Sequence, residues 1–251
     1  MNKNLPETLL PIAREAAHSA GSILSGTYRA DPGVQRTEGK DIKTNADLEA
    51  EKTIRRILEP TGIPILGEET GLSGSPSNHS LLWIIDPLDG TFNFVRGLPF
   101  CGVSIALWRD QDPLLGILFD LTDQSLLEGV VGSWARRDGE PIHVSRVAGT
   151  EQAALATGFP TQRDYGQEAL QTTISAIQKY KKIRMLGSAA LSLGQVACGR
   201  LEAYWEEDIW LWDVAAGLAL VKAAGGDYTL KPGTSAHQFH VFAHNGAMPP
   251  P

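Results

Sequence analysis

The sequence predicts an α+β fold in which helices and two sheets lie in layers. Apolar residues in 6–28 and 45–59 recur at helical spacing, which predicts two amphipathic helices near the start of the chain. From there to about residue 145, short apolar runs alternate with turn residues, a pattern typical of a mainly antiparallel sheet. From about residue 146 to 251, strand and helix patterns alternate, which predicts a second sheet between helices.

In the first half, the two helices are followed by five expected strands. A segment rich in turn-formers and charge, 29–41, separates the helices and is expected to be a mobile loop. Each expected strand is a short apolar run bounded by residues that favour turns. These runs are 63–66, 81–86, 101–108, 114–120 and 125–131.

In the second half, strands are expected at 153–159, 182–186, 201–206 and 240–245, and helices near 163–180, 188–198 and 211–224. Gly225 and Gly226 are expected to end the last helix, because glycine commonly occupies the position after a helix C-terminus. The sequence contains no obvious linker between the halves. The chain 1–251 is therefore expected to form one compact unit with a groove at the junction of the halves.

The composition excludes several classes of protein. A net charge of -7 and a pI near 5.4 argue against a nucleic-acid or anionic-membrane surface, since both recruit basic patches. Cys101 and Cys198 form neither a disulfide framework nor a thiolate metal site. Charged residues spread through the first helix leave it without the uninterrupted apolar core of a signal peptide, and no segment approaches the run of about 20 apolar residues of a membrane span. We therefore expect a cytoplasmic protein.

Two acids are predicted to point inward from helices. Asp47 shares a helical face with the apolar residues Ala50, Ile54 and Leu58. Asp213 shares its face with small and apolar residues, among them Leu220. Asp47 can also be read as a first-turn acid that complements the helix dipole, and the helix pattern alone does not decide between the two interpretations.

Two further pairs of acids follow expected strands. Glu68 and Glu69 come after the run 63–66, although adjacent acids in such a place are also typical of a solvated loop. In the stretch IIDPLDGTFNF, Asp86 lies at a strand end and Asp89 within the turn that follows. Turn chemistry explains the proline and the glycine of this stretch, but it requires neither acid.

Inward-facing carboxylates on separate elements need a common positive charge, because an unpaired buried carboxylate costs several kcal/mol. Lysine and arginine are sparse beside these motifs, and oxygen-only ligand sets suit hard cations such as Mg²⁺. Two cations held by shared carboxylates are a known arrangement for phosphate-ester hydrolysis. The Leu88 carbonyl can then turn inward, while Gly90 and Thr91 offer backbone N–H groups to a phosphate.

Four motifs in order carry a resemblance to a known family. They are DIKTNAD at 41–47, GEE at 67–69, DPLDGT at 86–91 and WDVAAG at 212–217. With these motifs the sequence resembles the inositol monophosphatase family, within the lithium-sensitive, magnesium-dependent phosphatases that include fructose bisphosphatases. The resemblance runs from the first expected helix to nearly the end of the chain.

The resemblance implies a layered αβαβα fold, a homodimer, inhibition by lithium, and phosphomonoester hydrolysis by metal-activated water without a covalent phosphoenzyme. It implies two or three Mg²⁺ ions per site, with Mn²⁺ as a possible substitute. The implied metal ligands are Glu68, Asp86, Asp89, Asp213 and the Leu88 carbonyl. By the same resemblance Glu69 lies behind the ligands, Asp47 and Thr91 orient and deprotonate the attacking water, and the Gly90 and Thr91 amides bind phosphate.

The substrate residues are also implied by resemblance. Glu206 precedes Asp213 by seven residues, which matches the acid that contacts substrate hydroxyls in inositol phosphatases, although a surface acid is the alternative. Ser188 and Ala189 resemble a substrate-lining segment, and such small residues can equally pack a helix. Inositol monophosphate is therefore the first expected substrate.

Several departures from the family pattern leave the substrate open. Arg36 and Lys40 both lie where the family often has one lysine, and neither is a clean match. Phe92 and Trp210 also differ from common family residues, which leaves histidinol phosphate, a 3'(2'),5'-bisphosphate nucleotide or fructose 1,6-bisphosphate as alternatives. A non-catalytic regulatory binding protein is the alternative from another class. The intact set of acids argues against it, because binding alone does not require them all.

Overall fold

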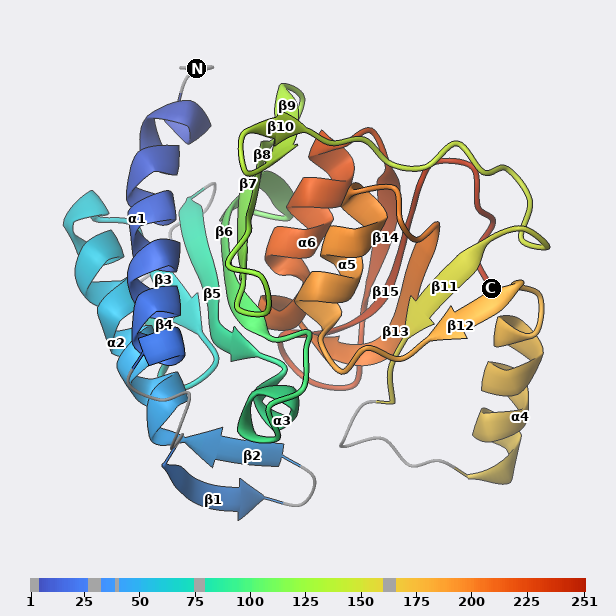
Figure 1. The fold of residues 1–251 in the computed structure, drawn as a ribbon, viewed down its shortest axis with the longest axis horizontal. Coiled ribbons are helices and arrows are strands. Elements are labelled where there is room, and N and C mark those ends of the chain that lie inside the picture. The colour runs from blue at the N-terminus through green and yellow to red at the C-terminus, as the bar shows by residue number, and fades with distance from the viewer. Residues whose placement is uncertain (1–4, 27–32, 39–40, 75–79, 160–165) are drawn as a thin grey trace.

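The computed structural model describes residues 5–26, 33–38, 41–74, 80–159 and 166–251, with the backbone alone at 34–38 and 41–42. Five layers succeed one another across the molecule (Figure 1). The helices α1 (Leu5–Gly26) and α2 (Asn45–Leu58) cover one face of a large sheet. The helices α5 (Ala189–Ala197) and α6 (Leu211–Ala223) lie between this sheet and a second one, and α4 (Gln167–Ile177) lies beyond the second sheet. The αβαβα architecture expected from the resemblance is confirmed.

The first sheet has eight strands in the order β10-β9-β8-β7-β6-β5-β3-β4. Its neighbours pair antiparallel except β3 and β5, which are parallel. Its strands are β3 (Ile65–Gly67), β4 (Gly71–Ser73), β5 (Leu81–Asp89), β6 (Gly102–Arg109), β7 (Asp112–Asp120), β8 (Leu126–Val130), β9 (Trp134–Arg137) and β10 (Glu140–Pro141). The mainly antiparallel sheet predicted from alternating apolar runs is therefore present.

The second sheet has five strands in the order β12-β11-β13-β15-β14. β11 pairs parallel with both β12 and β13, whereas β15 pairs antiparallel with β13 and β14. The strands are β11 (Ala154–Thr157), β12 (Lys182–Arg184), β13 (Ala203–Trp210), β14 (Asp227–Pro232) and β15 (Gln238–His244). β14 was not expected from the sequence, because four of its six residues are exposed and it ends at a proline.

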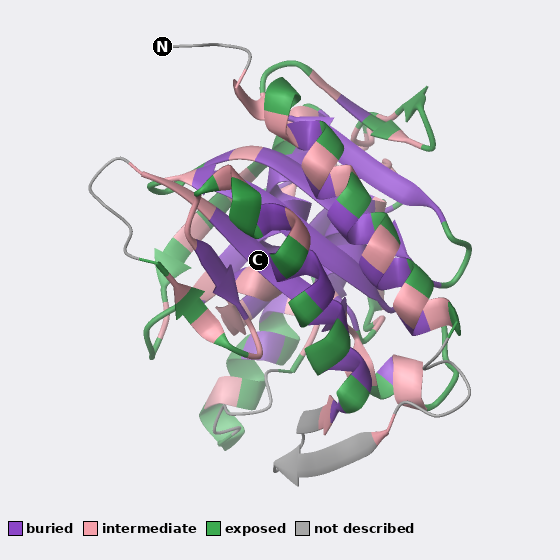
Figure 2. Ribbon diagram, turned by 90° about the vertical axis from the view of Figure 1, so that its left-hand side faces the viewer, coloured by how far each residue is buried: buried purple, intermediate pink, exposed green. Residues whose placement is uncertain are grey.

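Two large apolar cores hold the layers together. One lies between α1, α2 and the first sheet, and there Trp83 and Ile85 of β5 are fully buried. The other surrounds α5 and α6 between the two sheets and includes Ile84 from the opposite face of the same strand. Figure 2 shows the corresponding pattern on the helices, whose inward residues are buried and whose outward residues are exposed.

The segment 29–41 is not simply a loop, as the sequence suggested. Its described part contains the strand β1 (Val34–Glu38), which pairs antiparallel with β2 (Asp41–Thr44) to form a hairpin. Lys40 and the side chain of Arg36 lie outside the described residues. Other short elements were also missed, namely the strands β4, β9 and β10 and the helix α3 (Thr91–Val95). Gly225 follows α6 with φ +96°, so the expected end of that helix is confirmed.

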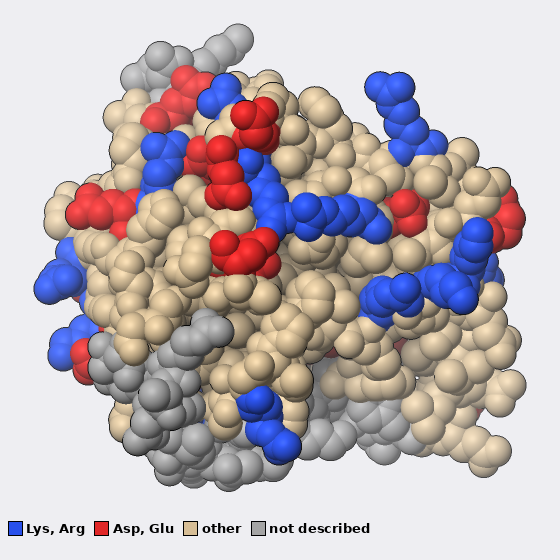
Figure 3. Space-filling view, in the orientation of Figure 1, with Lys and Arg blue, Asp and Glu red and all other residues tan. Residues whose placement is uncertain are grey.

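The described helices and the surface charge bear on the membrane-protein and nucleic-acid-binding classes considered above. Among the described residues, none of the helices combines the length and the apolar character that a bilayer-spanning segment needs. On the face drawn in Figure 3, described acidic and basic side chains are interspersed over the surface.

Helix α6 packs so closely on the first sheet that one glycine is required at the contact. A Cβ atom at Gly116 of β7 would lie 2.3 Å from the Ala216 carbonyl oxygen and 2.9 Å from the Ala219 Cβ. We expect Gly116→Ala to lower the free energy of unfolding by about 1–3 kcal/mol, because the helix must move away from the sheet. Urea denaturation measures this change. Gly26→Ala, whose Cβ would meet nothing within 4 Å, is the control, and an equal loss in both variants would contradict the prediction.

Candidate metal centre and active site

A β-bulge at the end of β5 brings Asp86 and Asp89 to one face of the sheet. Side chains three residues apart in a regular strand point to opposite faces. Here Asp86 pairs with Ser104 and Asp89 with Gly102, so β5 contains one residue more than β6 over this stretch. The extra residue restores the common face, which is the one directed at α5 and α6. Pro87 fits within the bulge because it has no N–H to pair.

Two local contacts fix the turn that follows. The backbone N–H of Leu88 donates to Asp86 Oδ1 at 2.9 Å. Gly90 has φ +85°, and a Cβ there would lie 2.7 Å from the Phe100 carbonyl oxygen. Only glycine is therefore accommodated before α3 begins at Thr91.

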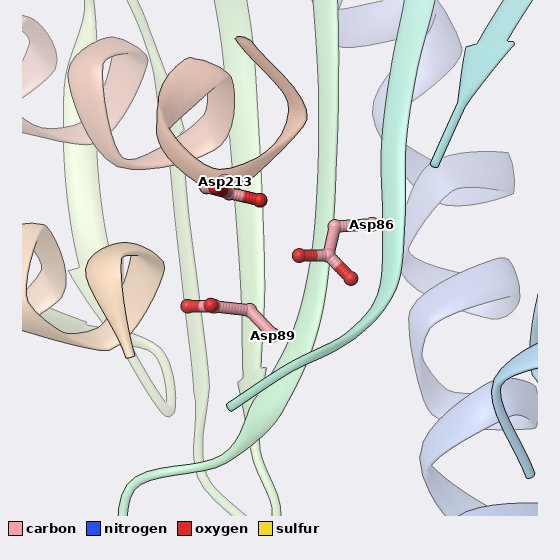
Figure 4. Close-up of side chains that lie close together, drawn as sticks. All are labelled: Asp86, Asp89 and Asp213. Atoms are coloured by element: carbon pink, nitrogen blue, oxygen red, sulfur yellow. The ribbon is translucent and has the colours of Figure 1, made fainter. Parts of the chain in front are cut away.

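The third acid of the cluster comes from the first turn of α6. The carboxylates of Asp86, Asp89 and Asp213 each have an oxygen within 4.8 Å of one in the other two (Figure 4). Asp89 also binds the N-terminus of α5, because its Oδ2 accepts from Ser188 Oγ at 2.5 Å and from the Ala190 N–H at 2.7 Å. The cluster thus joins the first sheet to both central helices.

Asp47 is held beside this cluster by the N-terminus of α2. It forms a capping box with Thr44, whose N–H donates to Asp47 Oδ2 at 2.9 Å. The Thr91 hydroxyl lies 3.1 Å from Asp47 Oδ1 and 2.9 Å from the Leu88 carbonyl oxygen, and it can donate to either. Asp47 is 1% exposed, so its predicted inward orientation is confirmed.

Glu68 and Glu69 follow β3 and are held by a second buried network. Glu51 of α2 accepts from the Glu69 N–H at 2.8 Å and from the Thr70 N–H at 3.1 Å. Arg55 donates to the same carboxylate at 2.8 Å and to the Gly71 carbonyl oxygen at 2.7 Å. The expectation of a merely solvated loop is therefore wrong, because the backbone beyond β3 is tied to α2.

The acids surround a cavity of about 360 Å³ at the junction of the two sheets. The predicted site residues that line it are Glu68, Asp86, Leu88, Asp89, Gly90, Thr91, Ser188, Ala189, Glu206 and Asp213. Asp47 lies one contact behind Thr91, and Glu69 is joined to the lining residue Lys43. The structure thus brings all the predicted site residues to this cavity or to one contact from it.

Glu206 lies on β13, across the cavity from the turn of Asp89. It is 8% exposed and its Oε2 accepts from the Tyr204 hydroxyl at 2.7 Å. Gly158 approaches it closely, since a Cβ there would lie 2.5 Å from the same oxygen. The alternative that Glu206 is a surface acid is therefore wrong.

Comparison with known proteins identifies the chain. A sequence profile of the inositol monophosphatase family matches residues 5–249. The chain belongs to the inositol monophosphatase family. Inositol monophosphatase 3 of Solanum lycopersicum is 37% identical over 231 residues, which cover 88% of this chain and 85% of that protein. Nus factor SuhB of Xylella fastidiosa is 38% identical over 218 residues, which cover 84% of this chain and 78% of that protein.

Solved structures agree with this assignment. The inositol monophosphatase from Anabaena (Nostoc) sp. PCC 7120 superposes with a TM-score of 0.83 at 34% identity, covering 96% of this chain and 92% of that one. The inositol monophosphatase family is a family of metal-dependent phosphatases, and the acidic cluster offers the oxygen ligands that a metal ion requires.

The electrostatics of the cluster fit a bound cation. Burial raises the pKa of Asp47 and of Asp89 to about 6, and burial together with Glu69 and Asp47 raises that of Glu68 to about 8. The pKa values of Asp86 and Asp213 are also raised, first by burial and then by neighbouring carboxylates. Burial and mutual repulsion make the ionised form of these carboxylates unfavourable. A divalent cation bound among them would stabilise the ionised form instead.

Four supporting residues were not expected from the sequence. Lys43 donates to Glu69 Oε2 at 3.0 Å, and Glu51 and Arg55 form the network described above. Asp47, Glu51 and Arg55 are spaced four residues apart on α2, a signal that the sequence did contain. Asn93 was missed as well, and its Nδ2 donates hydrogen bonds to the Phe100 and Leu186 carbonyl oxygens.

Glu51→Gln should weaken metal binding without unfolding the protein. The amide retains the shape of the carboxylate but presents a donor to groups that are themselves donors, so the backbone of 68–70 loses its position. We expect Mn²⁺ affinity, measured by calorimetric titration, to fall about 10–100-fold.

The matched control for this variant is Glu128→Gln. Glu128 is also buried and binds Arg14 at 2.9 and 3.0 Å, but it lies outside the cavity. Equal Mn²⁺ affinities in the two variants would show that Glu51 does not support the site.

The metal-free protein should lose stability as the pH rises. Between the unfolded carboxyl pKa values, about 4, and the folded values of about 6 to 8, the folded state binds more protons than the unfolded state. The stability that depends on protonation of these carboxyl groups is therefore fully present below about pH 4 and is lost toward pH 8. Thermal unfolding of metal-free protein between pH 5 and 8 measures this slope.

Added Mg²⁺ should reduce the slope, and Asp213→Asn should raise the melting temperature of the metal-free protein at pH 8 by removing one repelling charge. A pH dependence that neither Mg²⁺ nor Asp213→Asn alters would refute this account of the cluster.

Proposed function

We propose that the chain is a Mg²⁺-dependent phosphomonoesterase that acts on a small phosphorylated polyol, with inositol monophosphate as the first substrate to test. The observation that carries the proposal is the convergence of Asp86, Asp89 and Asp213 from β5 and α6 on one cavity. Membership of a metal-dependent phosphatase family supports the reaction class. Two or three Mg²⁺ ions per site, replaceable by Mn²⁺, are part of the proposal.

The ligands in this proposal are the three clustered carboxylates together with Glu68 and the Leu88 carbonyl. When bound, the divalent cations would supply positive charge to the phosphoryl oxygens and to the leaving alkoxide. The amides of Gly90 and Thr91 would bind the phosphate where the chain turns into α3.

Thr91 and Asp47 form the proposed path for a proton. The Thr91 hydroxyl can accept a hydrogen bond from a water in the cavity while it donates to Asp47 Oδ1 at 3.1 Å. Asp47, whose pKa is raised to about 6, is a stronger base than an ordinary aspartate. The water oxygen forms a bond to phosphorus as its proton passes through Thr91 to Asp47, and the bond between phosphorus and the alkoxide oxygen breaks. The alkoxide takes a proton from a second water molecule, and the hydroxide so formed takes up the proton held by Asp47, which leaves the alcohol and inorganic phosphate.

Glu206 is the proposed residue that reads the substrate. It faces the cavity from the second sheet, with Ser188 and Ala189 at the adjacent end of α5. A carboxylate accepts hydrogen bonds from neighbouring hydroxyls, which are the groups that a polyol offers. The Tyr204 hydroxyl fixes one Glu206 oxygen at 2.7 Å and holds the side chain in place.

One observation favours a second group of substrates. Trp210 lines the cavity and stacks on Trp212 with ring centroids 4.9 Å apart and planes at 7°. A flat aromatic wall suits substrates that contain an aromatic ring, such as the imidazole of histidinol phosphate or the base of a 3'(2'),5'-bisphosphate nucleotide. Fructose 1,6-bisphosphate stays an alternative on the chemistry of the acids alone.

Phosphate release with Mg²⁺ tests the proposal. We expect turnover of at least one member of a panel of inositol 1-phosphate, histidinol phosphate, adenosine 3',5'-bisphosphate and fructose 1,6-bisphosphate, and loss of that turnover with EDTA. Silence across the panel would favour the non-catalytic alternative, to which the name Nus factor SuhB of one relative also draws attention.

Two variants locate the activity. Asp89→Asn should abolish hydrolysis of every substrate, because it removes ligand charge with little change of size. Glu206→Gln should raise KM for a polyol substrate while leaving kcat less affected, since it changes binding and not the reacting groups. Near-normal turnover by Asp89→Asn would remove Asp89 from the site.

A further inference from the structure

The charged residues among the described lining of the cavity are mostly acids. Its lining includes the carboxylates of Glu68, Asp86, Asp89, Glu206 and Asp213. Among the described residues that line it, Lys43 is the only lysine or arginine. A phosphomonoester near neutral pH carries between about 1.5 and 2 negative charges, so it must enter a cavity whose protein groups largely repel it.

The backbone of Lys43 is held firmly while its side chain reaches the cavity. Lys43 is on β2, pairs with Arg36 across the hairpin, and precedes Thr44, the residue that caps α2. Its Nζ lies 3.0 Å from Glu69 Oε2, with the lysine side chain 38% exposed and the glutamate side chain 5% exposed. The lysine side chain is thus partly exposed, contacts a buried acid and lines the cavity.

We infer that Lys43 is a substrate-binding residue that contacts the phosphate of the phosphomonoester. This inference rests on the proposed function and adds a ligand contact to it. A lysine ammonium is a compact charge on a flexible stem with three donors, so one donor can bind a phosphate oxygen while another keeps Glu69. The partly exposed ion pair is weak enough to rearrange, since pairs of this kind contribute about 0–1 kcal/mol.

The position of Glu69 supports this assignment. Glu51 binds the Glu69 N–H, and the Glu69 side chain is buried, so the partner of Lys43 is fixed in place. Of the pair, Lys43 has the more exposed side chain, and it also lines the cavity. If Lys43 served only to neutralise Glu69, its replacement would change the cation affinity of the site and leave phosphate binding as it was.

Binding of inorganic phosphate to the Mg²⁺-loaded protein, measured by calorimetric titration, tests the inference. We expect K43Q to weaken phosphate binding roughly 10-fold or more, the effect of losing a charge-assisted hydrogen bond, and K43R to stay within about 3-fold of the wild type. K222Q is the matched control, because Lys222 makes a similar pair with Asp227 at 2.8 Å, is 42% exposed and is not among the residues that line the cavity. Its phosphate affinity should equal that of the wild type.

A second titration, with Mn²⁺ alone, separates the two roles. Unchanged phosphate affinity in K43Q, with tighter Mn²⁺ binding, would overturn the inference and assign Lys43 to Glu69 alone. If the wild type hydrolyses phosphomonoesters while K43Q binds phosphate normally, only the Lys43 assignment fails. If the wild type neither binds phosphate nor hydrolyses any phosphomonoester, the inference and the proposed function fail together. A K43R that loses phosphate binding with its melting temperature unchanged would also count against a simple charge contact.

Discussion

The repulsion among buried carboxylates is the constraint on which the centre of this structure depends. Asp86, Asp89 and Asp213 lie together where β5, α5 and α6 meet, and burial raises the pKa of each. No apolar packing requires acids there, so their presence costs folding free energy in the absence of a cation. The surrounding structure offsets that cost by close packing, in which α6 contacts β7 too tightly for any side chain at Gly116.

Two networks of different character serve this centre. Ligand positions are set by short, buried hydrogen bonds, such as those that Glu51 makes to the backbone of residues 69 and 70. The entrance is served by Lys43, whose contact with Glu69 is partly exposed. Under the proposed function, α2 supports the reacting groups, while β2 carries the charge offered to the incoming anion.

Much of the fold could be predicted because long amphipathic helices and buried strands have clear periodicities. The elements that were missed lack such a signal. β14 alternates weakly and ends at Pro232, and the hairpin of β1 and β2 lies in a segment rich in turn residues. Helix α3 has only five residues, and it begins after a glycine that reads as a turn.

Most acids of the site could be predicted because they follow a strand or occupy an inward face of a helix, whereas Glu206, within β13, was predicted from the family resemblance alone. Their convergence could not be derived from local pattern, since it depends on the layers packing together. The contacts of Lys43 and Arg55 are also set by tertiary structure. The four-residue spacing of Asp47, Glu51 and Arg55 on α2 marked Arg55 in advance, whereas no local pattern marked Lys43.

The additional residue in β5 has a consequence for how such a site can change over evolutionary time. Substitution at Asp86 or Asp89 alters one ligand and leaves the other in place. Deletion of a single residue between them would instead turn one carboxylate toward Trp83 and Ile85, into the apolar core beneath α1 and α2. The number of residues in this stretch therefore constrains the site as much as the identity of its acids, because that number decides which face of the sheet each carboxylate reaches.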